Sequence, residues 1–363
     1  MPSVVLVTGV SRYLGSRLAG RLAADPSVDR IIGVDTTPPS RPDLELLGRT
    51  EFVRADIRNP LIARVIRQAA VDTVVHASVT ATPHDAGGRT PMKELNVLGT
   101  MQLLAACQKS DTVRRLVVKS TTAVYGTSPR DPAVFTEDMP AKALPRSGYA
   151  KDAVEVEGYV RGFARRRPDI PVTVLRFANF VGPQVGTTLT RYFALPVVPT
   201  ALGYDPRIQV LHEADAVEAM RRATMVDLPG VFNVAGEGVL LLSQAARRAG
   251  RLAVPVPGPA VSLVSRMVRS RGLVDFSADQ MEFLNFGRVV DITKLKEEFG
   301  YTPAFTTAQA FEAFLAGAGI VPVITKDAVR RVEVTVAGLA TALVGALTAI
   351  ARSGAAAGER TDG

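Results

Sequence analysis

Short apolar runs alternate with amphipathic helical patterns through the first half of the chain. The runs with strand length and composition are VVLVT (4–8), RIIGVD (30–35), EFVRAD (51–56), DTVVHAS (72–78), RRLVVKST (114–121) and PVTVLRFA (171–178). Helices are predicted between them near 13–24, 60–69, 91–109 and from the 146–155 stretch to about 167. This order predicts an α/β fold, with a Rossmann-type doubly wound parallel sheet covered by helices on both faces.

The pattern changes after about residue 180. Pro and Gly become frequent and the strands become short, so the segment 181–325 is expected to form a smaller substrate-binding lobe. Residues 1–180 would form the nucleotide-binding domain, to which some later strands return. Residues 326–363 would form a helical tail that ends in a disordered segment.

The tail contains VTVAGLATALVGALTAIA (334–351), which carries no charge. Its larger residues, among them Val336, Leu339 and Leu343, recur at three-and-four spacing on a background of Ala, Gly and Thr. Such a stripe favours a helix that packs on protein or lies on a membrane surface, and its length is also the lower edge of a membrane span. Peripheral membrane contact through 334–351 therefore stays open.

Composition narrows the class of protein. The chain has 363 residues, 47% of them hydrophobic, and one cysteine, Cys107, so no internal disulfide can form. The start lacks a basic region followed by a long apolar run, so a cytoplasmic protein is expected. The net charge of +8 comes from scattered Arg pairs and one triplet at a helix end, 165–167, which does not indicate nucleic-acid binding. The three histidines show no metal-ligand spacing, so no metal is expected.

The first strand leads into a turn with nucleotide-binding spacing. Gly9 and Gly15 stand six residues apart, as the outer glycines of a dinucleotide-binding turn do, while Arg12 takes the place of the middle glycine. A pyrophosphate would rest on the helix N-terminus. Asp35, at the end of the second strand, can accept hydrogen bonds from ribose hydroxyls and repel a 2′-phosphate, which favours NAD over NADP. Asp56 is placed to meet the adenine edge. Either carboxylate could instead cap a turn, and Arg12 keeps NADP open.

Five segments complete a recognisable pattern. They are TGVSRYLG (8–15), VVHAS (74–78), ELNVLGTMQLL (94–104), KSTTAVYG (119–126) and LRFANFVGP (175–183). In order and spacing they resemble the extended short-chain dehydrogenase/reductase family, the NAD-dependent epimerases and dehydratases, over roughly residues 3 to 318. The resemblance implies NAD as cofactor, a nucleotide sugar as substrate and transient hydride transfer. It also implies a homodimer formed through the 91–109 helix and the helix that carries Lys151.

The resemblance assigns roles to residues in these segments. It implies a Tyr as general acid–base, a Lys that lowers the Tyr pKa and holds the nicotinamide ribose, and a Ser or Thr hydroxyl. The predicted catalytic residues are Thr121, Tyr149 and Lys151. The predicted cofactor site comprises Gly9, Arg12, Tyr13, Leu14, Gly15, Asp35, Asp56, Ile57, His76, Ala77, Asn96 and Lys151. The predicted substrate contacts are Thr122, Asn179 and Arg207.

The stretch RSGYAKDAVE (146–155) departs from the family pattern. Lys151 is followed by Glu155 in the family's spacing, but Ser147 holds the Tyr position four residues before the lysine. A serine hydroxyl is far less acidic than a phenol, and on a regular helix Tyr149 would point away from Lys151.

Two ways of keeping a phenol in the site stay open. An irregular first turn near Gly148 would bring Tyr149 inward, and Tyr125 is another phenol near Thr121. Lys119, two residues before Thr121, is expected to be an exposed strand-end lysine.

A second departure concerns the substrate. Ile208 stands where nucleotide-sugar members of the family carry an Arg, and Arg207 is one residue away. A slip of one residue on a strand changes the face on which a side chain lies.

Three functional hypotheses follow. The first is an NAD-dependent epimerase or dehydratase that acts on a nucleotide sugar. The second, motivated by Ser147, is an NAD(P)-binding protein with little or no catalysis that serves as a sensor or scaffold. The third, motivated by the tail, is a membrane-associated reductase or dehydrogenase of a lipid-like alcohol or ketone.

Overall fold

The computed structural model describes residues 2–81, 88–141, 144–145, 148–256, 278–320 and 322. Ser147 and the predicted helical tail at 326–363 lie outside these residues.

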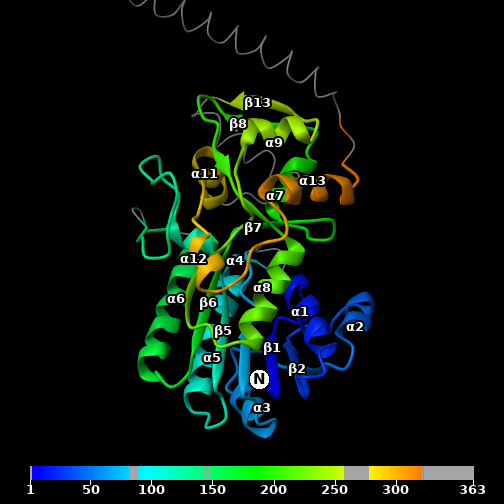
Figure 1. Ribbon diagram of the computed structural model, residues 1–363, viewed down its shortest axis with the longest axis vertical. Helices are drawn as coiled ribbons and strands as arrows, with labels where there is room; N and C mark the ends of the chain where they lie inside the picture. The colour runs from blue at the N-terminus through cyan, green and yellow to red at the C-terminus, as the bar shows by residue number, and fades with distance from the viewer. Residues whose placement is uncertain are drawn as a thin grey trace, which may run out of the picture.

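Seven parallel strands form the central sheet, in the order β11-β6-β5-β4-β1-β2-β3 (Figure 1). They are β1 (Val4–Thr8), β2 (Arg30–Asp35), β3 (Glu51–Arg54), β4 (Thr73–His76), β5 (Arg115–Thr121), β6 (Val172–Phe177) and β11 (Gly230–Val234). Central strands of such a sheet are buried on both faces, so they are continuously apolar rather than alternating. In β1, Val5, Leu6 and Val7 are all fully buried. The predicted doubly wound parallel sheet is therefore confirmed.

Helices cover both faces of the sheet. The first core cluster packs α1 (Tyr13–Ala23), α8 (Glu213–Met225) and α12 (Thr293–Glu297) on one face. The second packs α3 (Ile62–Gln68), α5 (Gly99–Gln108) and α6 (Gly148–Arg166) on the other. In α6 the inward residues Val156, Val160 and Phe163 follow the three-and-four spacing that gives a helix one apolar face.

A smaller lobe lies above the carboxyl ends of the strands (Figure 1). Its strands are β7 (Asn179–Val181), β8 (Val197–Ala201), β9 (Arg207–Ile208), β10 (Val210–His212), β12 (Leu240–Leu241), β13 (Leu252–Val256) and β14 (Gly287–Arg288). Its helices are α7 (Thr188–Ala194), α9 (Leu242–Arg248), α11 (Ala278–Phe286) and α13 (Thr307–Gly317). A third apolar cluster, which includes Phe193, Phe311 and Phe314, forms its core. The chain crosses between the lobes more than once, since α8 and β11 return to the sheet.

Two local features mark the helices near the carboxyl edge of the sheet. The helix predicted at 91–109 consists of α4 (Arg89–Lys93), a π-helical turn η2 (Glu94–Leu98) and α5. The helix α6 starts at Gly148, whose φ of +68° is a conformation that favours glycine. A π-helical turn of this kind is frequent at functional sites.

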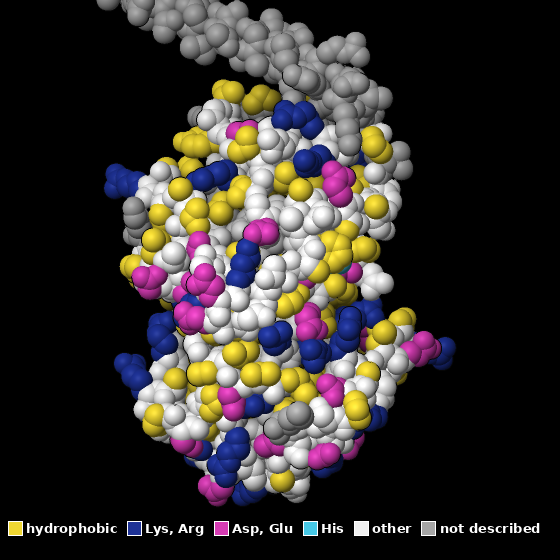
Figure 2. Space-filling view, in the orientation of Figure 1, with side chains coloured by type: hydrophobic (Ala, Val, Ile, Leu, Met, Phe, Trp, Pro, Cys, Tyr) yellow, Lys and Arg dark blue, Asp and Glu magenta, His cyan; other side chains and the backbone are white. Residues whose placement is uncertain are grey.

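Charges of both signs are mixed on the face of the molecule seen in Figure 2, where Lys and Arg side chains are interspersed with Asp and Glu. Among the described residues, no helix combines the length and apolar character needed to cross a membrane.

Candidate functional site

A cavity of about 680 Å³ opens at the carboxyl ends of the parallel strands, where the smaller lobe meets the sheet. It lies at the point where the chain order of the strands reverses, between β1 and β4, which is where open α/β sheets bind their ligands. Its lining includes Arg12, Tyr13, Leu14, Asp35, Ala77, Thr121, Tyr149 and Asn179 from the predicted site.

The turn after β1 has the close packing that the glycine spacing predicts. Gly9 has φ +77°, and a Cβ there would lie 2.8 Å from the Cα of Ser78. A Cβ on Gly15 would lie 2.1 Å from the carbonyl oxygen of Gly9, so only glycine lets α1 start this close to the turn. Arg12 precedes the first residue of α1 and lines the cavity. The turn thus offers a cation and a helix N-terminus to an anion such as a pyrophosphate.

Replacing Gly15 with Ala tests this contact. Because the added methyl meets backbone rather than a flexible side chain, the turn has to shift, and a loss of about 1–3 kcal/mol in unfolding free energy is expected. Urea unfolding measures it. The matched control is Gly158→Ala in α6, where the nearest atom is a side-chain nitrogen of Arg161 at 3.9 Å. Equal stability of the two variants would contradict the close contact.

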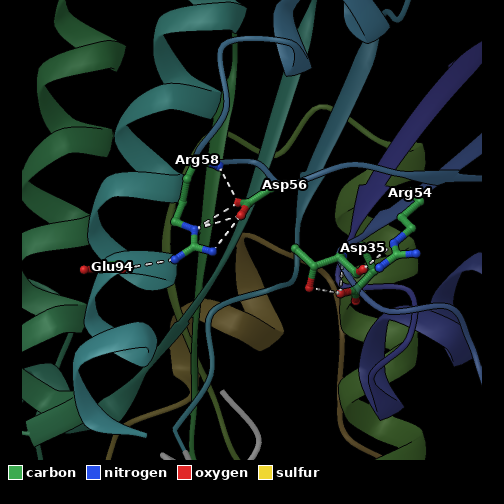
Figure 3. Close-up of polar contacts among 6 residues, drawn as sticks. Asp35, Arg54, Asp56, Arg58 and Glu94 are labelled. Carbon is green, nitrogen blue, oxygen red and sulfur yellow. Dashed lines mark hydrogen bonds and ion pairs between the residues drawn. The ribbon is translucent and has the colours of Figure 1, made fainter. Parts of the chain in front are cut away.

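Asp35 sits at the end of β2 and faces the cavity. One carboxylate oxygen accepts from the backbone N–H of Ser11 at 3.1 Å, and the other from that of Thr36 at 2.8 Å. Arg54 is its register partner on β3, and the Arg54 guanidinium donates to the carbonyl of Thr36 at 3.1 Å (Figure 3). The carboxylate is thus fixed at the cavity wall, with a cation on the neighbouring strand end.

Asp56 is not among the residues that line the cavity, and its contact with the adenine edge stays a prediction. The Arg58 guanidinium holds both of its oxygens, with Nη2 to Oδ2 at 2.6 Å, and also reaches Glu94 (Figure 3). These hydrogen bonds from Arg58 hold the pKa of Asp56 below its ordinary value. Ile57 is buried beneath Gly99, where a Cβ would lie 2.8 Å from the Ile57 side chain. Both residues therefore link the β3–α3 loop to the helix that starts at α4.

His76 and Thr122 are also absent from the cavity lining. His76 is buried, with Nδ1 3.0 Å from the Thr8 hydroxyl and Nε2 2.8 Å from that of Thr100. Burial, assisted by the charge of Lys119, lowers the His76 pKa to about 4, so its ring is neutral. Thr122 is buried in the short helix η3 (Thr122–Tyr125). Both residues are therefore buried in the protein interior rather than exposed in the cavity.

Asn96 forms hydrogen bonds with the backbone beside the cavity. From the π-turn its side chain exchanges two hydrogen bonds of 2.9 Å with the N–H and C=O of Thr80, in the loop after β4. Its amide also reaches Asp152, which is fully buried and forms a bidentate pair with Arg89 at 2.6 and 2.7 Å. Arg89 donates to the carbonyl of Gly148 as well. This network fixes the first turn of α6 against the loop after β4.

Tyr149 is directed into the cavity by that first turn. It lines the cavity beside Thr121 and forms a side-chain hydrogen bond with it. Burial raises the pKa of the Tyr149 phenol, the hydrogen bond with Thr121 opposes the rise, and the charge of Asp152 adds to it. The regular register of α6 thus places a phenol and a hydroxyl together, and no irregular first turn is needed. Tyr125, the other candidate, hydrogen-bonds Asn233 and Arg176 in the interior, each at 2.8 Å.

Lys151 does not lie in the cavity, which corrects its predicted role. Its side chain is exposed, because two residues along a helix from Tyr149 is nearly the opposite face. The residue one turn after Tyr149, on the same face, is Ala153, which is 1% exposed. One turn further, Glu157 forms a buried ion pair with Arg176 of β6 at 2.7 Å. The glutamate that faces the sheet is therefore Glu157, not Glu155.

Lys119 is the residue that sequence reasoning missed. It lines the cavity, and its Nζ donates to the carbonyl of Val79 at 2.7 Å. The expectation of an exposed strand-end lysine is wrong, because the side chain is half-buried at the cavity wall and contacts the loop after β4. The spacing from Thr121 was the available signal, since alternate residues of a strand share a face.

The smaller lobe supplies the other wall. Asn179 of β7 lines the cavity, but Arg207 is exposed and its neighbour Ile208 is fully buried. Arg288, on β14 beside β9, contributes a cation to this wall. Its Nε donates to the carbonyl of Gly126 at 3.0 Å, and its Nη2 donates to the Thr127 hydroxyl at 2.6 Å. In the described part of the chain, no group of three or more His, Cys, Asp or Glu residues could hold a metal ion.

This chain is similar in sequence to a known protein family and to individual known proteins. The model of the NAD dependent epimerase/dehydratase family matches residues 5–235. An uncharacterized protein of Mycobacterium tuberculosis is 50% identical over 339 residues, which are 93% of this chain and 90% of that protein.

Two solved structures share the fold. UDP-glucuronic acid 4-epimerase from Bacillus cereus, in complex with UDP-glucuronic acid and NAD, has a TM-score of 0.67 at 19% identity, covering 87% of this chain and 99% of that one. dTDP-glucose 4,6-dehydratase from Bacillus anthracis, in complex with NAD, has a TM-score of 0.67 at 20% identity, covering 87% and 96%.

Proposed function

The chain belongs to the NAD dependent epimerase/dehydratase family, and on that premise we propose that it binds NAD and transfers a hydride transiently to and from a nucleotide sugar. The observation that carries the proposal is the meeting of Tyr149 with Thr121 in a cavity that also holds the glycine turn and Asp35. A protein that only stored NAD would not need a phenol fixed at this point.

The cofactor would occupy the sheet side of the cavity. Its pyrophosphate fits the turn between Gly9 and Gly15, where Arg12 adds a positive charge. Its adenosine ribose fits Asp35, because a carboxylate at the end of the second strand accepts hydrogen bonds from ribose hydroxyls. NAD, when bound, supplies the hydride acceptor.

Asp35→Asn tests the preference for NAD. The variant keeps the size of the side chain but removes the charge that repels a 2′-phosphate, and Arg54 is nearby to attract one. The ratio of NAD to NADP affinity is expected to fall about tenfold or more, measured by titration of each cofactor. Glu45→Gln on α2 (Arg41–Leu47) removes one exposed negative charge and is the control. An unchanged ratio in Asp35→Asn would place the adenosine ribose elsewhere.

The reacting sugar would lie between Tyr149 and the smaller lobe. As a phenolate, the Tyr149 oxygen would take the proton of a sugar hydroxyl as the hydrogen on the same carbon leaves as hydride to NAD, and would return the proton when the hydride comes back. Thr121 donates to or accepts from the same oxygen. Asn179 and Arg288 line this side of the cavity and would bind the nucleotide diphosphate portion, since a guanidinium suits phosphate oxygens.

A homodimer forms part of this proposal. The helical surface of η2, α5 and α6 leaves Leu98, Met101 and Tyr159 exposed. Large apolar side chains on neighbouring helices are typical of a helical interface.

The test of the proposed function is direct. The purified protein is titrated with NAD, then incubated with UDP-glucose and UDP-glucuronic acid, and the sugars are examined by NMR. NAD binding and formation of a 4-epimer or a dehydrated keto-sugar are expected. Failure to bind NAD would refute the proposal, as would NAD binding without reduction of the cofactor or change in any nucleotide sugar.

A further inference from the structure

Lys119 is a cation in the interior of the cavity with few partners. An ammonium group has three hydrogens to donate, and the structure shows one acceptor, the carbonyl of Val79. The ring of Phe180 lies 5.9 Å from Nζ, a weak cation–π distance. Among the described residues no carboxylate forms an ion pair with Lys119. A half-buried charge with so few partners is unfavourable for the fold, which indicates that the cavity binds a group that interacts with it.

The charged groups around Lys119 add to that cost. Arg12, on the neighbouring turn before α1, repels it, and together with burial this lowers the pKa of Lys119 to about 8. His76 from β4 is the other titratable group that senses it, and its ring is neutral. Two cations that face one cavity without a carboxylate between them form a site for an anion or for oxygen-rich groups.

Lys119 is also close to the proposed chemistry. It lies on the same face of β5 as Thr121, two residues away, and Thr121 hydrogen-bonds Tyr149. On α6 the residue that shares a face with Tyr149 one turn later is Ala153, which carries no charge. The nearest lysine on that helix, Lys151, is exposed.

We propose that Lys119 is the active-site cation of this chain, donating from β5 to ribose and phosphate oxygens of the nicotinamide half of the cofactor. This inference rests on the proposed function. The positive charge of the active site would then come from Lys119 on β5, because the face of α6 that carries Tyr149 has no lysine. The positive charge of Lys119 near Thr121 also favours the ionised form of Tyr149, whose pKa burial raises.

The experiment compares Lys119→Met with Lys151→Met, which removes a lysine from the exposed face of α6. NADH is titrated by its fluorescence. At pH 7 the affinity of Lys119→Met is expected to fall about tenfold or more, since charge-assisted hydrogen bonds are lost, while Lys151→Met stays within about twofold of the wild type.

The pH dependence supplies a second readout. Lys119 is protonated below pH 8 and loses its charge as the pH rises through that value, so wild-type NADH affinity is expected to weaken between pH 7 and pH 9. Arg12 keeps its charge throughout this range, and His76 is neutral at both ends. In Lys119→Met the dependence disappears.

Rescue and stability separate this role from a structural one. Ala153→Lys in the Lys119→Met background places an ammonium one turn after Tyr149 and is expected to recover part of the NADH affinity. Thermal unfolding of Lys119→Met is expected at the wild-type temperature or above it, because a penalised half-buried charge is gone. If the Met variant does not fold, Lys119→Gln replaces it.

The outcomes are distinct. If the wild type binds NADH and Lys119→Met binds it equally with the same pH dependence, the role of Lys119 is refuted while the proposed function stands. If the wild type does not bind NADH, both are refuted.

Discussion

Tyr149→Phe is expected to lower kcat about 10²–10⁴-fold, the range that a positioned general acid–base contributes. The ring still fills its place at the start of α6, so the fold and the cofactor affinity should stay close to those of the wild type. What is lost is the oxygen that hydrogen-bonds Thr121 and exchanges the substrate proton. The measurement is turnover of whichever nucleotide sugar the wild type accepts, together with NADH titration of both proteins.

The matched control is Tyr159→Phe, which removes the same atom from an exposed position of the same helix. Its kcat is expected to be unchanged. If Tyr149→Phe retained full activity, proton transfer would have to run through another group and the proposed role of Tyr149 would be wrong.

Arg176→Met is expected to destabilise the protein by about 3–5 kcal/mol, because the buried carboxylate of Glu157 loses its close, buried cation and keeps only the exposed guanidinium of Arg161 at 3.6 Å. Arg176 Nε and Nη2 donate to the two oxygens of Glu157 at 2.9 and 2.7 Å, and Nη1 donates to the Tyr125 hydroxyl. Ser120 donates to the same carboxylate at 2.6 Å, so one cation organises β5, β6 and α6. Urea unfolding gives the change in free energy.

Two comparisons make the result specific. Arg30→Met removes one partner of the solvent-exposed pair with Glu51, and little change is expected, because exposed ion pairs contribute little. The double variant Arg176→Met with Glu157→Leu replaces the whole buried pair by apolar groups and is expected to recover much of the loss. A double variant as unstable as Arg176→Met would show that the unpaired carboxylate is not the cause.

Features that depend on neighbouring residues could be predicted from the sequence. The strand runs are continuous and apolar because both faces of the sheet are covered, and the glycine turn depends on the contact between Gly9 and Gly15 six residues apart. The position of Asp35 at the cavity could be predicted because the residue ends a strand with a clear apolar pattern. These local rules predict the sheet, the edge of the cavity and the glycine turn.

Residues whose role depends on distant partners were misplaced. The pattern Lys151 with Glu155 and the pattern Ala153 with Glu157 have the same spacing, and only the contact of Glu157 with Arg176 of β6 distinguishes them. Lys119 is partly covered by the loop after β4, a contact that the sequence of its own strand does not predict. Arg288 reaches the cavity from a strand 161 residues beyond its partner Thr127.

The return of β11 to the sheet sets a limit on how the protein can be made. When only the first 180 residues have emerged from the ribosome, β11 and α8 have not yet been synthesised. The edge of β6 is then unpaired, and α1 is not covered by α8. Such an edge invites pairing with another chain. The nascent protein is therefore most exposed to aggregation until Val234 has emerged, and a fragment cut at the lobe boundary should be recovered largely in inclusion bodies.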